Sequence, residues 1–187
     1  MFVGILLDDA NANRVSVNRV VRNGDDIIVF GNDNTIAGND VARAVGLRRR
    51  LRSRHLARGR RGQPGDPQRG GPHVVRDGIR VAAFEPEVPT LDNVVRDNWS
   101  TTRGSMGCRS EPRATGRVTG TVLGRNLALR SSDDWIDVES PLTTLTRNLA
   151  LHNTDLGIEA VPGVTDGGGN RARGNGNPAQ CTGVACH

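Results

Sequence analysis

The chain has 187 residues with no tyrosine, three phenylalanines and two tryptophans, which excludes a core packed around aromatic rings. Its formal net charge is +5, but residues 47–73 contain nine arginines and one acid, Asp66, so the rest of the chain is net negative. The basic character therefore belongs to one segment. No apolar stretch approaches the roughly 18 residues of a membrane span, so we expect no membrane span.

The first forty residues contain short stretches in which apolar side chains alternate, as in residues 15–17 and 28–30. Asn18 precedes Ile28 by ten residues. A further asparagine, Asn39, lies 21 residues after Asn18. Strands of this length, separated by polar turns, predict an all-β fold. The opening residues 1–7 are too short for the apolar region of a signal peptide, so this chain shows none.

Residues 47–73 interrupt this pattern, because they contain no valine or isoleucine and are rich in Arg, Gly and Pro. We consider three interpretations: an inserted or disordered basic loop, a nucleic-acid-binding arm, and a span translated out of frame. The segment has no aromatic residue, so it cannot stack on bases and only phosphate attraction would remain. We therefore predict no nucleic-acid partner.

Asparagine is missing from residues 41–91 and again between Trp99 and Arg125, so we expect residues 99–125 to be irregular. The separation of Asn39 from Asn126 is close to four times the period of the repeat that follows. The chain thus keeps the length of the missing units while it loses their pattern. Compensating frameshifts in the gene would preserve length and lose the pattern in this way. One alternative is therefore that the chain is a degenerate, partly frameshifted product without activity.

The clearest repeat comes next, since residues 125–129 (Arg-Asn-Leu-Ala-Leu) return as residues 147–151. An isoleucine stands ten residues after each asparagine, and Asn170 lies as far beyond Asn148 as Asn148 lies beyond Asn126. This period predicts a parallel β-helix, a solenoid with coils of about 22 residues in which equivalent residues stack. Asparagine tolerates left-handed backbone and forms side-chain ladders, so we interpret Asn126, Asn148 and Asn170 as a structural ladder.

The C-terminal residues carry a resemblance to a known family. The run 153–170, which ends in Asp-Gly-Gly-Gly-Asn, and residues 174–181 (Gly-Asn-Gly-Asn-Pro-Ala-Gln-Cys) resemble the last coils and cap of actinobacterial right-handed β-helix repeat proteins. These are similar to the pectate-lyase-like superfamily and to NosD-type β-helix domains. The resemblance implies one right-handed β-helix domain over residues 1–187, with a cap or tail at 163–187. It also implies an extracellular or cell-surface location.

For function, the resemblance implies a non-catalytic β-helix repeat protein that binds polysaccharide. The alternative is a carbohydrate-active lyase or glycoside hydrolase, because the same repeat serves enzymes and binding proteins alike. Asp133 and Asp155 each follow a ladder asparagine by seven residues, so stacking would place them about one strand spacing apart. That distance is near the roughly 5 Å of a retaining glycosidase pair, and these two are the candidate catalytic residues. An acid that recurs at one repeat position is, however, first a turn residue.

Cys181 and Cys186 lie close together at the C-terminus and are compatible either with a disulfide or with two reduced thiols. His187 follows them, but three such residues at a chain end do not make a metal site. We predict no metal and no cofactor.

Overall fold

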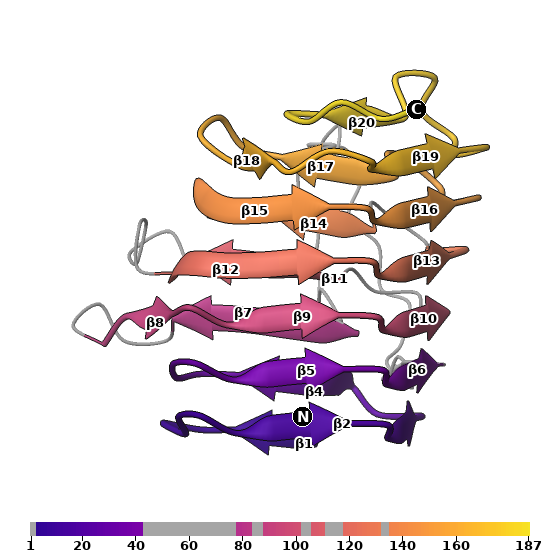
Figure 1. Cartoon of the computed structure of the whole chain (residues 1–187). Coiled ribbons are helices and arrows are strands. Elements are labelled where there is room, and N and C mark those ends of the chain that lie inside the picture. Colours follow the sequence, from indigo (N-terminus) through magenta and orange to yellow (C-terminus); the bar gives the residue numbers. More distant parts are fainter. Residues whose placement is uncertain (1–2, 43–77, 84–87, 102–105, 111–117, 132–134) are drawn as a thin grey trace, which may run out of the picture.

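The computed structural model describes residues 3–42, 78–83, 88–101, 106–110, 118–131 and 135–187. Every element within these ranges is a β-strand, and all strand pairs are parallel. The strands form three sheets, which we call A, B and C, that run the length of the molecule (Figure 1).

Along the chain, successive strands belong to sheets A, B and C in turn. We call one such run through the three sheets a pass, and each strand pairs with strands of the preceding and following passes. Sheet A consists of β1 (Val3–Leu7), β4 (Asp25–Val29), β7 (Ile79–Ala83), β11 (Met106–Ser110), β14 (Ile136–Val138), β17 (Ile158–Ala160) and β20 (Cys181–Thr182). Sheet B consists of β2 (Arg14–Ser16), β5 (Thr35–Ala37), β9 (Val94–Arg96), β12 (Val118–Gly124), β15 (Leu142–Thr146) and β18 (Thr165–Asp166), with β8 (Thr90–Leu91) paired to β12. Sheet C consists of β3 (Arg19–Val21), β6 (Asp40–Ala42), β10 (Trp99–Thr101), β13 (Leu127–Leu129), β16 (Leu149–Leu151) and β19 (Arg171–Arg173).

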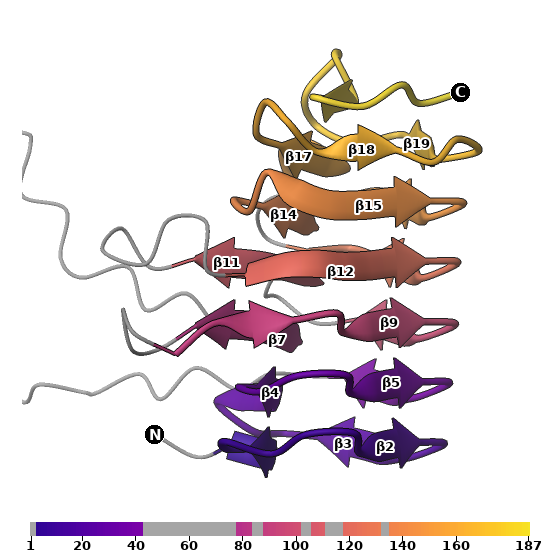
Figure 2. The same ribbon diagram turned by 60° about the vertical axis from the view of Figure 1, so that its left-hand side comes forward.

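The all-β prediction is confirmed, and parallel strands in stacked sheets are compatible with a parallel β-solenoid. Figure 2 shows the passes lying one above another, with β2, β5, β9, β12, β15 and β18 along one side. No helix in the described part of the chain is long and apolar enough to cross a membrane.

The core lies between the three sheets and is built from aliphatic side chains stacked in register. Ile27 pairs with Ile79, and Ile136 pairs with Ile158, and all four are buried. Sheet C contributes smaller side chains, because Ala128 lies beside Ala150 and both are fully buried. Burial of a large aliphatic side chain contributes roughly 1.5–3 kcal/mol, so stability accumulates as the passes stack.

The step between stacked residues departs from 21 or 22 first between β6 and β7 and again between β10 and β13. At the first of these, β4 pairs directly with β7, and β6 pairs directly with β10, so no further pass lies between them. Asn39 stacks on Asn98, 59 residues later, and Asn98 stacks on Asn126 after another 28. The expectation that four periods separate Asn39 from Asn126 is therefore wrong, because the chain takes two unequal steps. Residues 47–73 themselves lie outside the described residues.

Residues 99–125 contain β10, β11 and β12, so strands fall where the sequence shows no repeat. β12 is extended to seven residues and pairs with β8, β9 and β15, with a register shift between Thr119 and Val122. Asparagine is absent here because Thr121 occupies the position that Asn93 holds in the pass before. The strand pairing thus continues although the sequence signature changes.

The C-terminal residues 163–187 contain β18, β19 and β20 and end beside the core. Cys181 and Cys186 form a disulfide, and both pack against the core together with Val184. Gly183 has a positive φ of 77°, and a Cβ atom there would lie 2.0 Å from the carbonyl oxygen of Ala160. Only glycine therefore fits where the tail crosses back over β17.

Candidate functional site

The strongest local feature is a ladder of asparagines, buried except in the first pass, at the B–C corner, by which we mean the turn from each strand of sheet B to the next strand of sheet C. The ladder consists of Asn18, Asn39, Asn98, Asn126, Asn148 and Asn170. The structure thus places Asn126, Asn148 and Asn170 in one stack, and each of the three is at most 1% exposed.

From Asn39 onward, each ladder amide uses both its oxygen and its nitrogen. The Oδ1 atom of Asn148 accepts hydrogen bonds from the backbone N–H and the Nδ2 group of Asn126, both at 3.1 Å. The Nδ2 group of Asn148 donates to Oδ1 of Asn170 at 3.1 Å and to the carbonyl oxygen of Leu123 at 2.9 Å. The hydrogen bonds of these buried amides are made within the protein, so the amides do not line a surface that could bind a ligand.

Two further ladders were not predicted from the sequence. At the A–B corner, the turn into sheet B, Asn13 donates to Asn34, which donates to Asn93. At the C–A corner, the turn out of sheet C, Ser131 donates to Asn153, which donates to Asn175. The missed signal is a spacing of five residues between asparagines, which occurs at 13/18, 18/23, 34/39, 93/98, 148/153 and 170/175.

Directly before each ladder residue the backbone adopts the left-handed conformation. At the B–C corner these residues are Val17, Gly38, Asp97, Arg125, Arg147 and Gly169, with φ between 53° and 71°. Arg, Asp and Gly recur at this position and are exposed, while the following asparagine is buried in every pass but the first. The corners therefore present columns of exposed side chains at the strand spacing of about 4.8 Å.

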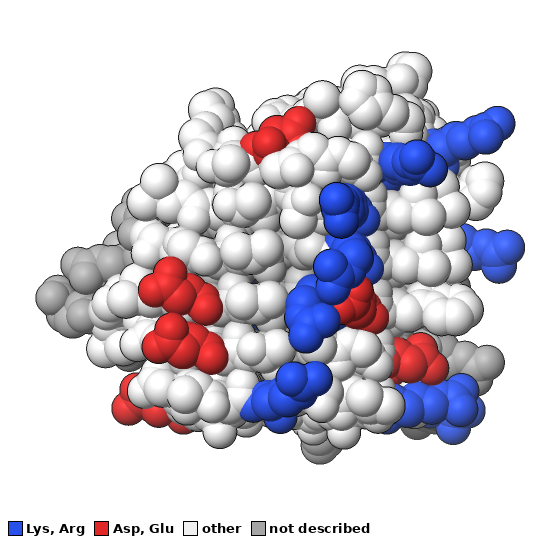
Figure 3. Space-filling model, viewed as in Figure 1, with Lys and Arg blue, Asp and Glu red and all other residues white. Residues whose placement is uncertain are grey.

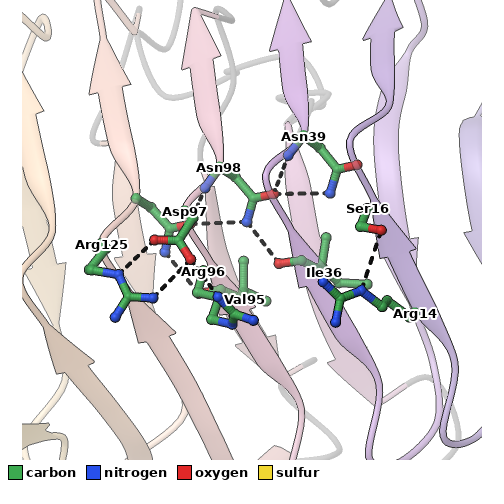
Figure 4. A network of polar contacts seen from close by, with 10 residues as sticks. Arg14, Ser16, Ile36, Asn39, Val95, Arg96, Asp97, Asn98 and Arg125 are labelled. Atoms are coloured by element: carbon green, nitrogen blue, oxygen red, sulfur yellow. Dashed lines mark hydrogen bonds and ion pairs between the residues drawn. The ribbon is translucent and has the colours of Figure 1, made fainter.

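Among the charged groups of these columns, the carboxylate of Asp97 accepts three hydrogen bonds from arginines (Figure 4). Arg125 holds its carboxylate with two bonds, from Nε at 2.6 Å and from Nη2 at 2.9 Å. Arg96 adds a third from Nη1 at 2.6 Å. The hydrogen bonds from Arg125, followed by those from Arg96, lower the pKa of Asp97 to about 2, and the same contact raises the pKa of Arg125. Two arginines on one carboxylate leave a net positive corner, next to Arg147.

The outer face of sheet B lies between this corner and the A–B corner. The register aligns the outward positions in two rows, in which every side chain except two arginines is short. The rows are Arg14, Thr35, Val94, Val122, Thr144 and Thr165, and Ser16, Ala37, Arg96, Gly124 and Thr146. Asp33 and Asp92 are exposed at the A–B corner on the other side. Figure 3 shows uncharged atoms between acidic side chains on the left and a vertical series of arginines. We call this surface the sheet B face.

The predicted pairing of the candidate catalytic residues Asp133 and Asp155 is not tested by the described residues. Asp133 lies outside the described residues. Asp155 is exposed, and its Oδ1 accepts a hydrogen bond from Nδ2 of Asn177 at 2.9 Å. This contact is that of a turn residue joined to the next pass.

Asp26, which neighbours Asp25 in β4, is a fully buried carboxyl group. Burial is the main cause that raises its pKa to about 7, against a hydrogen bond of 3.3 Å from Nδ2 of Asn23, and the neighbouring Asp25 raises it further. Raised carboxyl pKa values cluster at functional sites, but they also occur in structural pairs. Among the described residues no group of three His, Cys, Asp or Glu side chains is arranged to hold a metal ion.

Comparisons with known proteins return no match: no family model, no curated protein and no solved structure matches this chain. The candidate site is therefore defined by its geometry alone.

Proposed function

We propose that the chain is a right-handed parallel β-helix with coils of about 22 residues, which binds polysaccharide without catalysis at the cell exterior. Register steps of 21 and 22 residues between stacked asparagines support the coil length. The disulfide between Cys181 and Cys186 supports an oxidising compartment, in which disulfides persist.

The observation that carries the binding proposal is the sheet B face with its ordered edge. Hydroxyl groups of Thr35, Thr144 and Thr146 lie among mostly short side chains, on which a sugar chain can rest without a cavity. Asp97, fixed by Arg96 and Arg125, offers acceptors and donors in a set orientation along one edge. Polar groups held in place before binding lose little entropy when they bond to sugar hydroxyls.

The test is binding of the full chain to a panel of soluble polysaccharides by isothermal titration calorimetry. Thr144→Arg places a long side chain in the middle of the sheet B face, and Thr182→Arg places the same side chain on exposed β20 of sheet A as the matched control. We expect Thr144→Arg to weaken binding at least about tenfold and Thr182→Arg to leave it unchanged. Absence of binding to every polysaccharide, or equal loss in both variants, contradicts the proposal.

The same samples distinguish the carbohydrate-active enzyme. Release of reducing sugar, or of unsaturated products that absorb in the ultraviolet, would establish catalysis. Loss of that turnover in Asp155→Asn would identify Asp155 as the group responsible.

A further inference from the structure

The outer face of sheet C differs from the sheet B face, because it is apolar in its centre. Trp99 is 52% exposed and lies beside Leu127, which lies beside Leu149 in the next pass. A second row contains Leu129 beside Leu151. All four leucines are partly exposed, whereas Ser100, Ala128 and Ala150 between them face the core. Neighbouring exposed apolar side chains of this kind mark an interaction surface.

Arginines surround this apolar centre. Arg171 and Arg173 extend the two rows on β19, because Arg171 lies beside Leu149 and Arg173 beside Leu151. Arg125 and Arg147 stand at the B–C corner, and Arg22 and Arg130 stand at the C–A corner. Figure 3 shows arginine side chains at the right-hand edge, where Figure 1 places sheet C.

The described acids on the strands of sheet C, and those directly before the B–C ladder residues, are already paired with arginines. Asp40 lies 3.5 Å from Nε of Arg19, and Asp97 is held by Arg96 and Arg125. The surplus charge of the face is thus positive, although the chain outside residues 47–73 is net negative. The basic side chains are concentrated on sheet C and its corners, which makes the occupant an anionic one.

Two copies of the chain do not pair symmetrically through this face, because their arginines would meet. A nucleic acid would use Trp99 and the arginines but would gain nothing from four leucines. All three kinds of side chain can interact with a bilayer that has anionic headgroups. Tryptophan and leucine enter the interfacial region, and arginine binds the headgroups. We propose that the outer face of sheet C binds peripherally to an anionic lipid surface, with Trp99 inserted between headgroups.

The experiment uses the full chain and vesicles of phosphatidylcholine, with or without phosphatidylglycerol. The chain has two tryptophans, of which Trp135 is fully buried, so a blue shift of tryptophan emission on adding vesicles reports Trp99. We expect cosedimentation and a blue shift with the anionic vesicles only, and loss of both at high salt.

The double variant Arg171→Glu and Arg173→Glu should weaken cosedimentation by about tenfold or more. The control variant Arg14→Glu, on exposed β2 of sheet B, should bind like the unmodified chain. The nine arginines of residues 47–73 also attract anionic vesicles, but they would give binding without a shift in the emission of Trp99. Binding without that shift, equal binding to neutral vesicles, or equal loss in both variants overturns the proposal.

Discussion

Gln180 occupies the place that a further asparagine would take above Asn175. Its Oε1 atom accepts hydrogen bonds from the backbone N–H and the Nδ2 group of Asn175, both at 3.0 Å. Its Nε2 group donates to the carbonyl oxygens of Asn175 at 3.2 Å and Asn177 at 2.6 Å. A side chain five residues away therefore closes the C–A ladder in the way that a new pass would.

This relationship predicts that Gln180→Ala destabilises the C-terminal end first. The amide donors of Asn175 would lose their acceptor, and we expect a loss of about 1–2 kcal/mol. Hydrogen exchange at residues 175–187 should accelerate before that of the central passes. Gln180→Glu keeps the acceptor and should lose less, whereas an equal loss in both variants would show that acceptance is not what matters.

The central ladder predicts a larger cost for Asn148→Ala. Removal of this amide leaves the buried N–H and Nδ2 groups of Asn126 and the carbonyl oxygen of Leu123 without their partner. We expect the free energy of unfolding in denaturant to fall by about 3 kcal/mol. Asn18→Ala removes an exposed amide at the first pass, and a loss of about 1 kcal/mol is expected there. A loss in Asn148→Ala no larger than in Asn18→Ala would contradict the ladder's role.

Val17 is strained, because a β-branched residue there adopts a φ of 58° while its side chain is 83% exposed. Gly38 and Gly169 occupy the same corner position in other passes. Val17→Gly should therefore stabilise the chain by about 1 kcal/mol in chemical denaturation. Val21→Gly, which changes the same residue type within strand β3, should destabilise it by about 0.5–1 kcal/mol. Destabilisation by both substitutions would argue against strain at Val17.

The raised pKa of Asp26 makes stability depend on pH. Between about pH 4 and pH 7 the folded chain keeps the proton that the unfolded chain releases, so stability falls as pH rises through this window and stays low above it. Asp26→Asn should flatten this dependence and, at pH 8, stabilise the chain by up to about 4 kcal/mol. Asn23→Ala removes a hydrogen bond that lowers the pKa and should extend the decline to higher pH. Unfolding midpoints measured across this range check both variants, and an unchanged slope in Asp26→Asn would exclude Asp26 as the titrating group.

The sequence predicts parallel strands well because one five-residue segment, residues 125–129, recurs unchanged at residues 147–151. It did not reveal Asn98 as the ladder residue between Asn39 and Asn126, because unequal separations of 59 and 28 residues hide the regular step of 22. The five-residue spacing between Asn93 and Asn98 survives the interruption, because it is set by the length of one strand and its turn.

The candidate surfaces were less accessible to sequence reasoning. The exposure of Trp99 depends on which positions of β10 face outward, and strand alternation gives that only once the register is known. Asp97 and Arg125 are 28 residues apart, and only the stacking of β9 on β12 brings them into contact. Asp155 was singled out by its recurrence, which reflects a turn shared with Asn177 in the following pass.

The direct pairing of β6 with β10 means that the number of residues connecting two passes can vary, whereas the register between their strands is fixed. Asn39 bonds to Asn98 across 59 residues with the same geometry that Asn126 and Asn148 use across 22. The connection after β6 is therefore a permissive position, at which a peptide tag or a whole foreign domain can be grafted while the amide ladder on either side closes as before.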